Sequence, residues 1–284
     1  MPTLLTSEQL SFYEINGYLH APAVIPPDLL DLMTIVLSRW ADDTINAWLA
    51  EGLITNPRAD LDLQHRLAHL WEAAGRPEYI RSPRRDLVSS EMFDVLIHPA
   101  LLALAQDLLD THEISVHGIF NARPKLPDQI WTQTPWHQDA QYYRDAEQVH
   151  VTSIWMPLQP VTEHNSCLQV APGLHRGPLH EGWNDPETGF LGLAPEVRAA
   201  LEGVSVEMQP GDALCFTQIT PHRALPNRSS QVRWSIDVRY EPTAQATAAG
   251  QKQGFIAHSP KNPNAVPTYQ QWMKKWEKIP TGSY

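Results

Sequence analysis

Residues 232–240 read VRWSIDVRY, the clearest strand pattern in the chain. Apolar or aromatic side chains alternate with arginine, serine and aspartate, and successive side chains of a strand point to opposite faces. The two faces are Trp234, Ile236, Val238 and Tyr240 on one side, and Arg233, Ser235, Asp237 and Arg239 on the other. This pattern predicts a long strand with one apolar face and one charged face.

Five more short strand patterns lie in the second half of the chain. They cover residues 113–121, 149–158, 166–170, 204–208 and 213–216. Between them lie loops and turn sequences, including Pro172-Gly173 and Pro210-Gly211, whose residue types favour tight turns. Several short strands joined in this way predict a β-sandwich or barrel.

The two ends of the chain have helical patterns. Thr6 followed by Gln9 is a capping-box signature for a first helix, and apolar residues continue at roughly helical spacing to Leu19. Asn16-Gly17 suggests a stop and a turn. Further helices are expected from Pro27 to Trp40 and over 63–74, 91–110 and 269–277.

Helices first and strands afterwards predict a single domain, residues 1–284, with a helix-flanked β core. Its parts are a mostly helical buttress (1–110), the β core (111–240) and a C-terminal extension (241–284). Within the buttress, residues 56–86 contain six arginines: Arg58, Arg66, Arg76, Arg81, Arg84 and Arg85. The segment is either a solvated surface insertion, or a lid or anion-recognising wall over a substrate, because arginine forks bind carboxylates and phosphates.

Composition limits the class of protein. The chain has 284 residues, 42% of them hydrophobic, and 21 basic against 32 acidic residues give a net charge of −11. This charge argues against non-specific nucleic-acid or anionic-membrane binding. Cys167 and Cys215 lie in apolar runs and are expected to be reduced core thiols, and no signal peptide is visible. We expect a cytoplasmic protein without a nucleic-acid or membrane partner, of undetermined oligomeric state.

The chemistry is predicted to lie in residues 136–143, WHQDAQYY. If this segment is extended, His137 and Asp139 point to the same side. They supply two ligands of a facial triad for non-haem Fe(II), and the third should be a histidine from a distant strand. His222 is the best candidate, while His175 and His180 remain rivals when the residues alone are considered.

Arg233 follows His222 by eleven residues and suits a bidentate grip on a carboxylate. Ser235 faces the same way on the strand and offers a hydroxyl beside it. A cosubstrate such as 2-oxoglutarate chelates a metal through one end and needs a cation at the other. A metal triad beside a carboxylate clamp is therefore the functional hypothesis.

In their order along the chain, these residues resemble the phytanoyl-CoA dioxygenase family of Fe(II)/2-oxoglutarate-dependent oxygenases. The matching motifs are Pro135-Trp136-His137-Gln138-Asp139, Trp155-Met156-Pro157-Leu158, Asn165-Ser166-Cys167-Leu168, Pro172-Gly173-Leu174-His175, Pro210-Gly211-Asp212, His222, Asn227-Arg228-Ser229 and Arg233. The resemblance covers most of the chain and is densest over 117–240. Ser166 and Leu174 depart from the family pattern, where glycine and serine are usual.

The resemblance implies a mainly β fold, a double-stranded β-helix of the cupin-like jelly-roll type, flanked by N-terminal and C-terminal helices. It implies Fe(II) held by His137, Asp139 and His222, with Arg233 on the tail of 2-oxoglutarate and Asn121 also contacting this cosubstrate. The implied reaction consumes O2 and hydroxylates (or desaturates or cyclises) a small organic molecule, releasing succinate and CO2, with ascorbate as a supporting reductant. Because Asp139 is kept, hydroxylation is favoured over halogenation.

Two other readings stay open. A cupin-like metal-dependent isomerase or epimerase would work without 2-oxoglutarate, and Arg233 would then hold the carboxylate of the substrate. A non-catalytic barrel would bind a metal or ligand without turnover. Aromatic residues near the site can pack in the core or line a substrate pocket: Trp136, Trp155, Tyr142 and Tyr143. Whether the substrate is linked to coenzyme A is open.

Overall fold

The computed structural model describes residues 4–77, 84–130, 133–143, 150–245 and 247–282. Its largest sheet has seven strands in the order β1-β9-β4-β11-β2-β12, and β3 also pairs with β11. These strands are β1 (Tyr18–Ala21), β2 (Ile114–Val116), β3 (Asn121–Ala122), β4 (Thr152–Pro157), β9 (Ala213–Thr217), β11 (Ser235–Pro242) and β12 (Phe255–His258).

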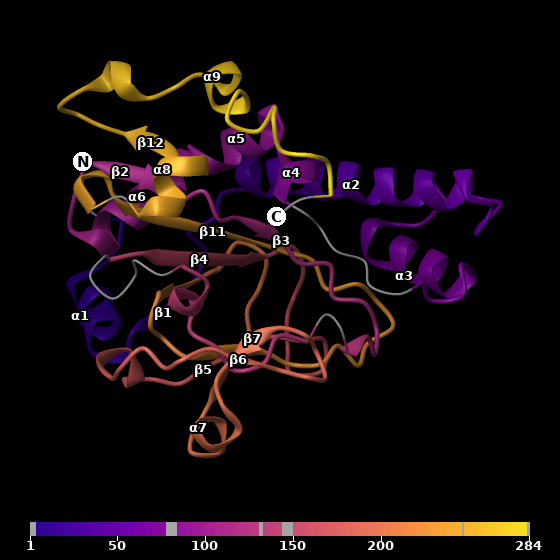
Figure 1. Cartoon of the computed structure of the whole chain (residues 1–284), viewed down its shortest axis with the longest axis horizontal. Coiled ribbons are helices and arrows are strands. Elements are labelled where there is room, and N and C mark those ends of the chain that lie inside the picture. Colours follow the sequence, from indigo (N-terminus) through magenta and orange to yellow (C-terminus); the bar gives the residue numbers. More distant parts are fainter. Residues whose placement is uncertain (1–3, 78–83, 131–132, 144–149, 246, 283–284) are drawn as a thin grey trace.

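A second sheet has the order β10-β5-β8, and a third consists of β6 and β7. Their bounds are β5 (Leu168–Val170), β6 (Trp183–Asn184), β7 (Leu191–Gly192), β8 (Val204–Val206) and β10 (His222–Ala224). Figure 1 shows helices α2, α4 and α5 on one side of the large sheet and β5, β6 and β7 on the other. The predicted fold class, a mainly β core flanked by helices, is confirmed.

The helices are α1 (Ser7–Asn16), α2 (Pro27–Ala50), α3 (Leu63–Ala73), α4 (Arg84–Leu87), α5 (Ser90–Leu96), α6 (Pro99–Leu109), α7 (Pro195–Ala199), α8 (Ala248–Gln253) and α9 (Tyr269–Met273). The predicted capping box of α1 is present, and Gly17 ends this helix in the left-handed conformation with φ 76°. Leu19 is therefore not helical as expected. It lies in β1, an edge strand that pairs with β9.

The helix predicted over 91–110 is two helices. Pro99 is the first residue of α6, and His98 before it is extended, with φ −61° and ψ 133°. The residue before a proline is driven out of the helical region by a steric clash with the proline ring, which separates α5 from α6. Among the described residues, Ser90–Leu109 alone has the length and hydropathy of a membrane span, and half of it is buried inside the molecule.

The apolar face of β11, together with Trp234 just before it, packs on the helices. Trp234 meets Trp40 of α2 edge to face, with ring centroids 5.9 Å apart, and the Tyr240 hydroxyl donates to the Leu96 carbonyl at 2.8 Å. One apolar cluster contains buried residues from Leu5 to Trp276. The charged face of β11 is buried as well, and its side chains take part in the site described next. Cys167 and Cys215 are buried, free thiols, as predicted.

Candidate metal centre

His137, Asp139 and His222 converge on one point. The structure places one ligand atom from each within 4.8 Å of the others, and all three residues are buried. His222 begins β10, and two backbone hydrogen bonds of 3.0 Å pair it directly with His137. Residues 85 positions apart in sequence are therefore fixed side by side by main-chain pairing.

The segment before Asp139 is extended, but Asp139 itself starts a short 3-10 helix, η2 (Asp139–Tyr142). The prediction of one continuous extended segment is therefore right only as far as Gln138, with φ −112° and ψ 131°. The buried Gln138 amide donates to the carbonyls of Pro178 and Ile219 at 3.1 and 2.9 Å. These hydrogen bonds hold Gln138 in place and thereby fix the positions of His137 and Asp139 on either side of it.

Backbone carbonyls set the orientation of both imidazoles. Nδ1 of His137 lies 2.9 Å from the Pro135 oxygen, and Nδ1 of His222 lies 3.0 Å from the Thr220 oxygen. When Nδ1 carries the proton and donates it, Nε2 presents a lone pair to the centre. Burial lowers the pKa of His137 to about 3 and also lowers the pKa of His222, which favours the neutral, metal-binding form.

Asp139 is held by an arginine that the sequence did not single out for the site. Arg239 of β11 donates from Nε to Oδ2 at 2.9 Å and from Nη2 to Oδ1 at 2.8 Å, and the Ser153 hydroxyl donates to Oδ2 at 2.6 Å. Oδ1 lies 3.8 and 4.0 Å from Nε2 of His137 and His222. Burial alone would raise the pKa of Asp139, but Arg239 and the histidines lower it below its usual value.

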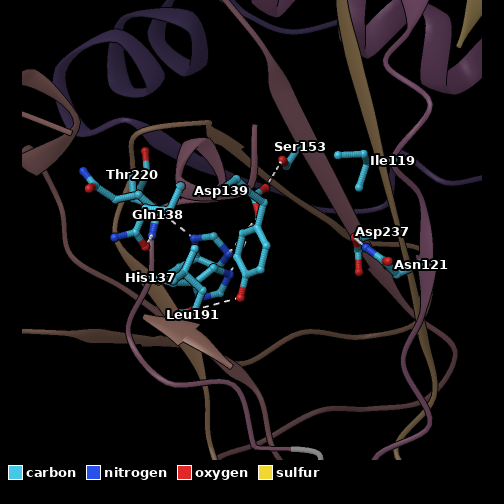
Figure 2. A network of polar contacts seen from close by, with 12 residues as sticks. Ile119, Asn121, His137, Gln138, Asp139, Ser153, Leu191, Thr220 and Asp237 are labelled. Carbon is cyan, nitrogen blue, oxygen red and sulfur yellow. Dashed lines mark hydrogen bonds and ion pairs between the residues drawn. The ribbon is translucent and has the colours of Figure 1, made fainter. Parts of the chain in front are cut away.

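A chain of charges, buried except at Arg123, extends from Asp139. Arg239 also donates to Asp237 at 2.7 Å, and Asp237 accepts from Arg123 at 3.0 Å and from Asn121 at 2.7 Å. Figure 2 shows Ser153 directed at Asp139, and Asn121 at Asp237. Two arginines, Arg239 and Arg123, thus match the two aspartates.

Arg233 lies just before β11 and is 1% exposed. Its guanidinium carbon lies 5.2 Å from the centre of the Trp155 ring, and Nη1 donates to the Ser235 hydroxyl, as the shared strand face predicts. Within the described part of the chain, its Nε has no hydrogen-bond partner and no acid pairs with it. Burial and the nearby Arg123 lower the pKa of Arg233 to about 9, so it stays cationic at neutral pH.

Two cavities meet at the triad. A narrow one is lined by His137 and His222 together with Arg233, Lys125 and Trp155. A larger one, of about 350 Å³, is lined by His137 and Asp139 and by residues of several loops, among them Arg84, Asn121, Arg123, Tyr142, Tyr143, Phe190 and Leu191. The triad residues border open space, because His137 and Asp139 also line the larger cavity and His137 and His222 the narrow one. This residue set fits a facial triad that would hold Fe(II).

Comparison with known proteins places the chain in a family. The sequence model of the phytanoyl-CoA dioxygenase (PhyH) family matches residues 13–235. The chain belongs to the phytanoyl-CoA dioxygenase family. A probable phytanoyl-CoA dioxygenase of Caenorhabditis elegans is 24% identical over 245 residues, covering 84% of this chain and 76% of that protein.

Two solved structures share the fold. The non-haem monooxygenase ThoJ aligns with a TM-score of 0.63 and 18% identity, covering 94% of this chain and 93% of that one. The epimerase SnoN, in complex with Fe3+, α-ketoglutarate and nogalamycin RO, aligns with a TM-score of 0.53 and 17% identity, covering 98% and 91%. Family membership and the converged triad make this chain a non-haem iron oxygenase that depends on 2-oxoglutarate.

The structure also locates the other residues considered for the oxygenase site. The rival His175 is directed at the Glu14 carbonyl, 3.0 Å away, and does not join the triad. Trp136 packs with Ala171 and Leu193, whereas the other three aromatic candidates face the cavities. Asn121 lines the larger cavity, so its predicted contact with 2-oxoglutarate stays a prediction.

The arginines of residues 56–86 differ in the contacts that they make. Three form ion pairs: Arg58 with Asp60 and Arg76 with Glu72 at the surface, and the partly buried Arg66 with Asp42. Arg85 donates to the Ile279 carbonyl, and Arg81 lies outside the described residues. Arg84 lines the larger cavity of the oxygenase. Among the described arginines of this segment, Arg84 is the one that lines this cavity, so the role of the segment stays a prediction.

Proposed function

We propose that this oxygenase hydroxylates a small organic molecule and converts 2-oxoglutarate and O2 to succinate and CO2. The observation that carries the proposal is that one narrow cavity is lined both by the triad histidines and by a buried arginine. The imidazoles of the triad line it, and so does Arg233, whose buried guanidinium lacks an acidic partner among the described residues. A 2-oxo diacid has the two groups that such a cavity recognises.

The residues have separate roles in this proposal. His137, Asp139 and His222 hold Fe(II), which when bound supplies the oxidising chemistry. Arg233 holds the far carboxylate of 2-oxoglutarate, with Ser235 orienting the guanidinium. Retention of the Asp139 carboxylate favours hydroxylation over halogenation, because the carboxylate stands in the place that a halide would need.

Arg239 keeps Asp139 ionised and fixes its rotamer through two hydrogen bonds. The positive guanidinium offsets the negative charge of the carboxylate electrostatically. The carboxylate also cannot swing away from the centre without breaking three hydrogen bonds, including the one from Ser153. This support pre-organises the ligand set before the metal arrives.

The larger cavity indicates the class of substrate. Ile119, Phe190 and Leu191 give it apolar walls, and Arg84 and Arg123 add two cations. Among the described residues, Arg123 donates to Asp237 through Nε, and its side chain is 33% exposed. Its terminal N–H groups are therefore positioned to reach a ligand. We therefore propose a small substrate with an apolar body and a carboxylate or phosphate group.

Succinate release from 2-oxoglutarate, measured in air with Fe(II) and ascorbate, tests the proposed reaction. Wild-type enzyme should form succinate even without its substrate, and amphipathic acids should raise the rate more than their neutral amides. Asp139→Ala should lower succinate formation to background, while exposed Asp60→Ala should not change it. Undiminished turnover by Asp139→Ala would show that another residue supplies the carboxylate.

The same assay separates the alternatives. An isomerase or epimerase that needs no 2-oxoglutarate would convert its substrate at the same rate with and without this compound. A binding protein would form no succinate under any condition. Either result would contradict the proposal.

A further inference from the structure

Lys125 is a buried lysine without a partner. It is 2% exposed, and among the described residues its ammonium nitrogen has no hydrogen-bond acceptor and forms no ion pair. Burying an ammonium without compensation is strongly unfavourable, so lysine is rarely found fully buried unless it is paired. Such a side chain, lining a cavity, points to a ligand that supplies the missing acceptor.

Lys125 lies directly opposite Arg233. Two backbone hydrogen bonds of 3.0 Å connect the pair, and directly opposite residues of antiparallel segments present their side chains on the same face. Both side chains line the narrow cavity that also reaches His137 and His222. The metal centre and a pair of cations therefore share one narrow space.

The charges around this cavity do not balance. Asp237 is matched by Arg123 and Arg239, and Arg239 also matches Asp139. Arg233 and Lys125 are left without an acid in the part of the chain that the structure describes. Burial, Arg233 and Arg123 hold the pKa of Lys125 well below its usual value, as expected for cations crowded together without an anion.

We propose that Lys125 is a second anchor for the far carboxylate of 2-oxoglutarate and acts together with Arg233. The proposal rests on the proposed function, since it assumes that 2-oxoglutarate occupies the narrow cavity. Two cations on one carboxylate make the site selective for a 2-oxo diacid over a 2-oxo monoacid. Lys125 is thus a positioning and specificity residue that does not touch the reacting atoms.

Binding measured by calorimetry on Mn(II)-loaded enzyme without O2 tests this role. The two probes are 2-oxoglutarate and 2-oxobutanoate, which has the same metal-binding end but no far carboxylate. Lys125→Met should weaken 2-oxoglutarate binding about tenfold to a hundredfold, the usual effect of losing a hydrogen bond to a charged group. Binding of 2-oxobutanoate should stay unchanged, and Lys125→Arg should restore most of the affinity for 2-oxoglutarate.

A control separates this role from a structural one. The exposed Lys261→Met should bind both probes like wild type. Equal weakening of both probes by Lys125→Met, or no weakening of 2-oxoglutarate, would overturn the role of Lys125. If Lys125→Met does not fold, Lys125→Gln provides the same comparison. Failure of wild-type enzyme to bind 2-oxoglutarate would instead contradict the proposed function.

Discussion

Two buried charged clusters lie within the same core and differ in how they are paired. In the first, Asp139, Arg239, Asp237 and Arg123 form a chain in which each charge has an opposite partner. In the second, Arg233 and Lys125 have no acid among the described residues. In a paired cluster the charges neutralise one another and hold the side chains in a fixed geometry, whereas unpaired buried cations favour the binding of an anion. The first therefore serves the metal ligands and the second serves the cosubstrate.

The largest expected effect comes from breaking the paired cluster. Arg239→Met leaves Asp139 and Asp237 buried with fewer cations, and removal of one partner from a buried ion pair costs about 3–5 kcal/mol of stability. Urea unfolding of the metal-free protein measures this loss. As a control, Arg76→Met removes an exposed ion pair with Glu72 and should cost at most about 1 kcal/mol. Equal losses in the two variants would show that the chain of charges adds no stability.

Removing a cation of the unpaired cluster should change the stability little and the affinity for 2-oxoglutarate strongly. Arg233→Met removes a buried cation that has no acid to lose, so the unfolding free energy without cosubstrate should change by less than about 1 kcal/mol or rise. The affinity for 2-oxoglutarate should fall about tenfold to a hundredfold. Calorimetry measures the affinity for 2-oxoglutarate and, separately, the affinity for Mn(II). An equal loss of metal affinity would contradict the division between the clusters.

The sequence predicted the parts of the site that lie on one strand or at a fixed spacing. His137 and Asp139 came from their separation by two residues. His222 was the best candidate because Arg233 follows it by eleven residues, and the family resemblance ranked it above His175 and His180. The triad residues do converge, and Arg233 does contact Ser235. Local patterns and an ordered motif set carried this information.

The sequence did not predict which strands pair or which side chains meet across them. Arg239 lay on the charged face of the predicted strand, which was the available signal, but its contact with Asp139 depends on how the chain folds back. Lys125 gave no signal at all, because only the register opposite Arg233 shows that it is buried and unpartnered. The four-residue strands β1 and β12 were missed because edge strands this short show too little alternation to separate them from loops or helix ends.

The last expected effect depends on pH and concerns His137, whose imidazole lies close to the paired cluster. Asp139 already has Arg239 as its cation and does not need a charged imidazole beside it. Burial lowers the pKa of His137 to about 3 in the folded metal-free protein, against about 6.5 in the unfolded chain. Between these values the unfolded chain binds a proton that the folded protein does not, so stability falls as the pH drops below 6.5.

At pH 5 this single group should reduce the unfolding free energy of the metal-free protein by about 2 kcal/mol relative to pH 7.5. Urea unfolding at several pH values should show a smaller loss in His137→Gln, which cannot take up the proton, whereas exposed His164→Gln should follow wild type. An unchanged pH dependence in His137→Gln would mean that the folded protein carries a charged imidazole. The His137 imidazolium would then be a second cation beside Asp139, in addition to Arg239.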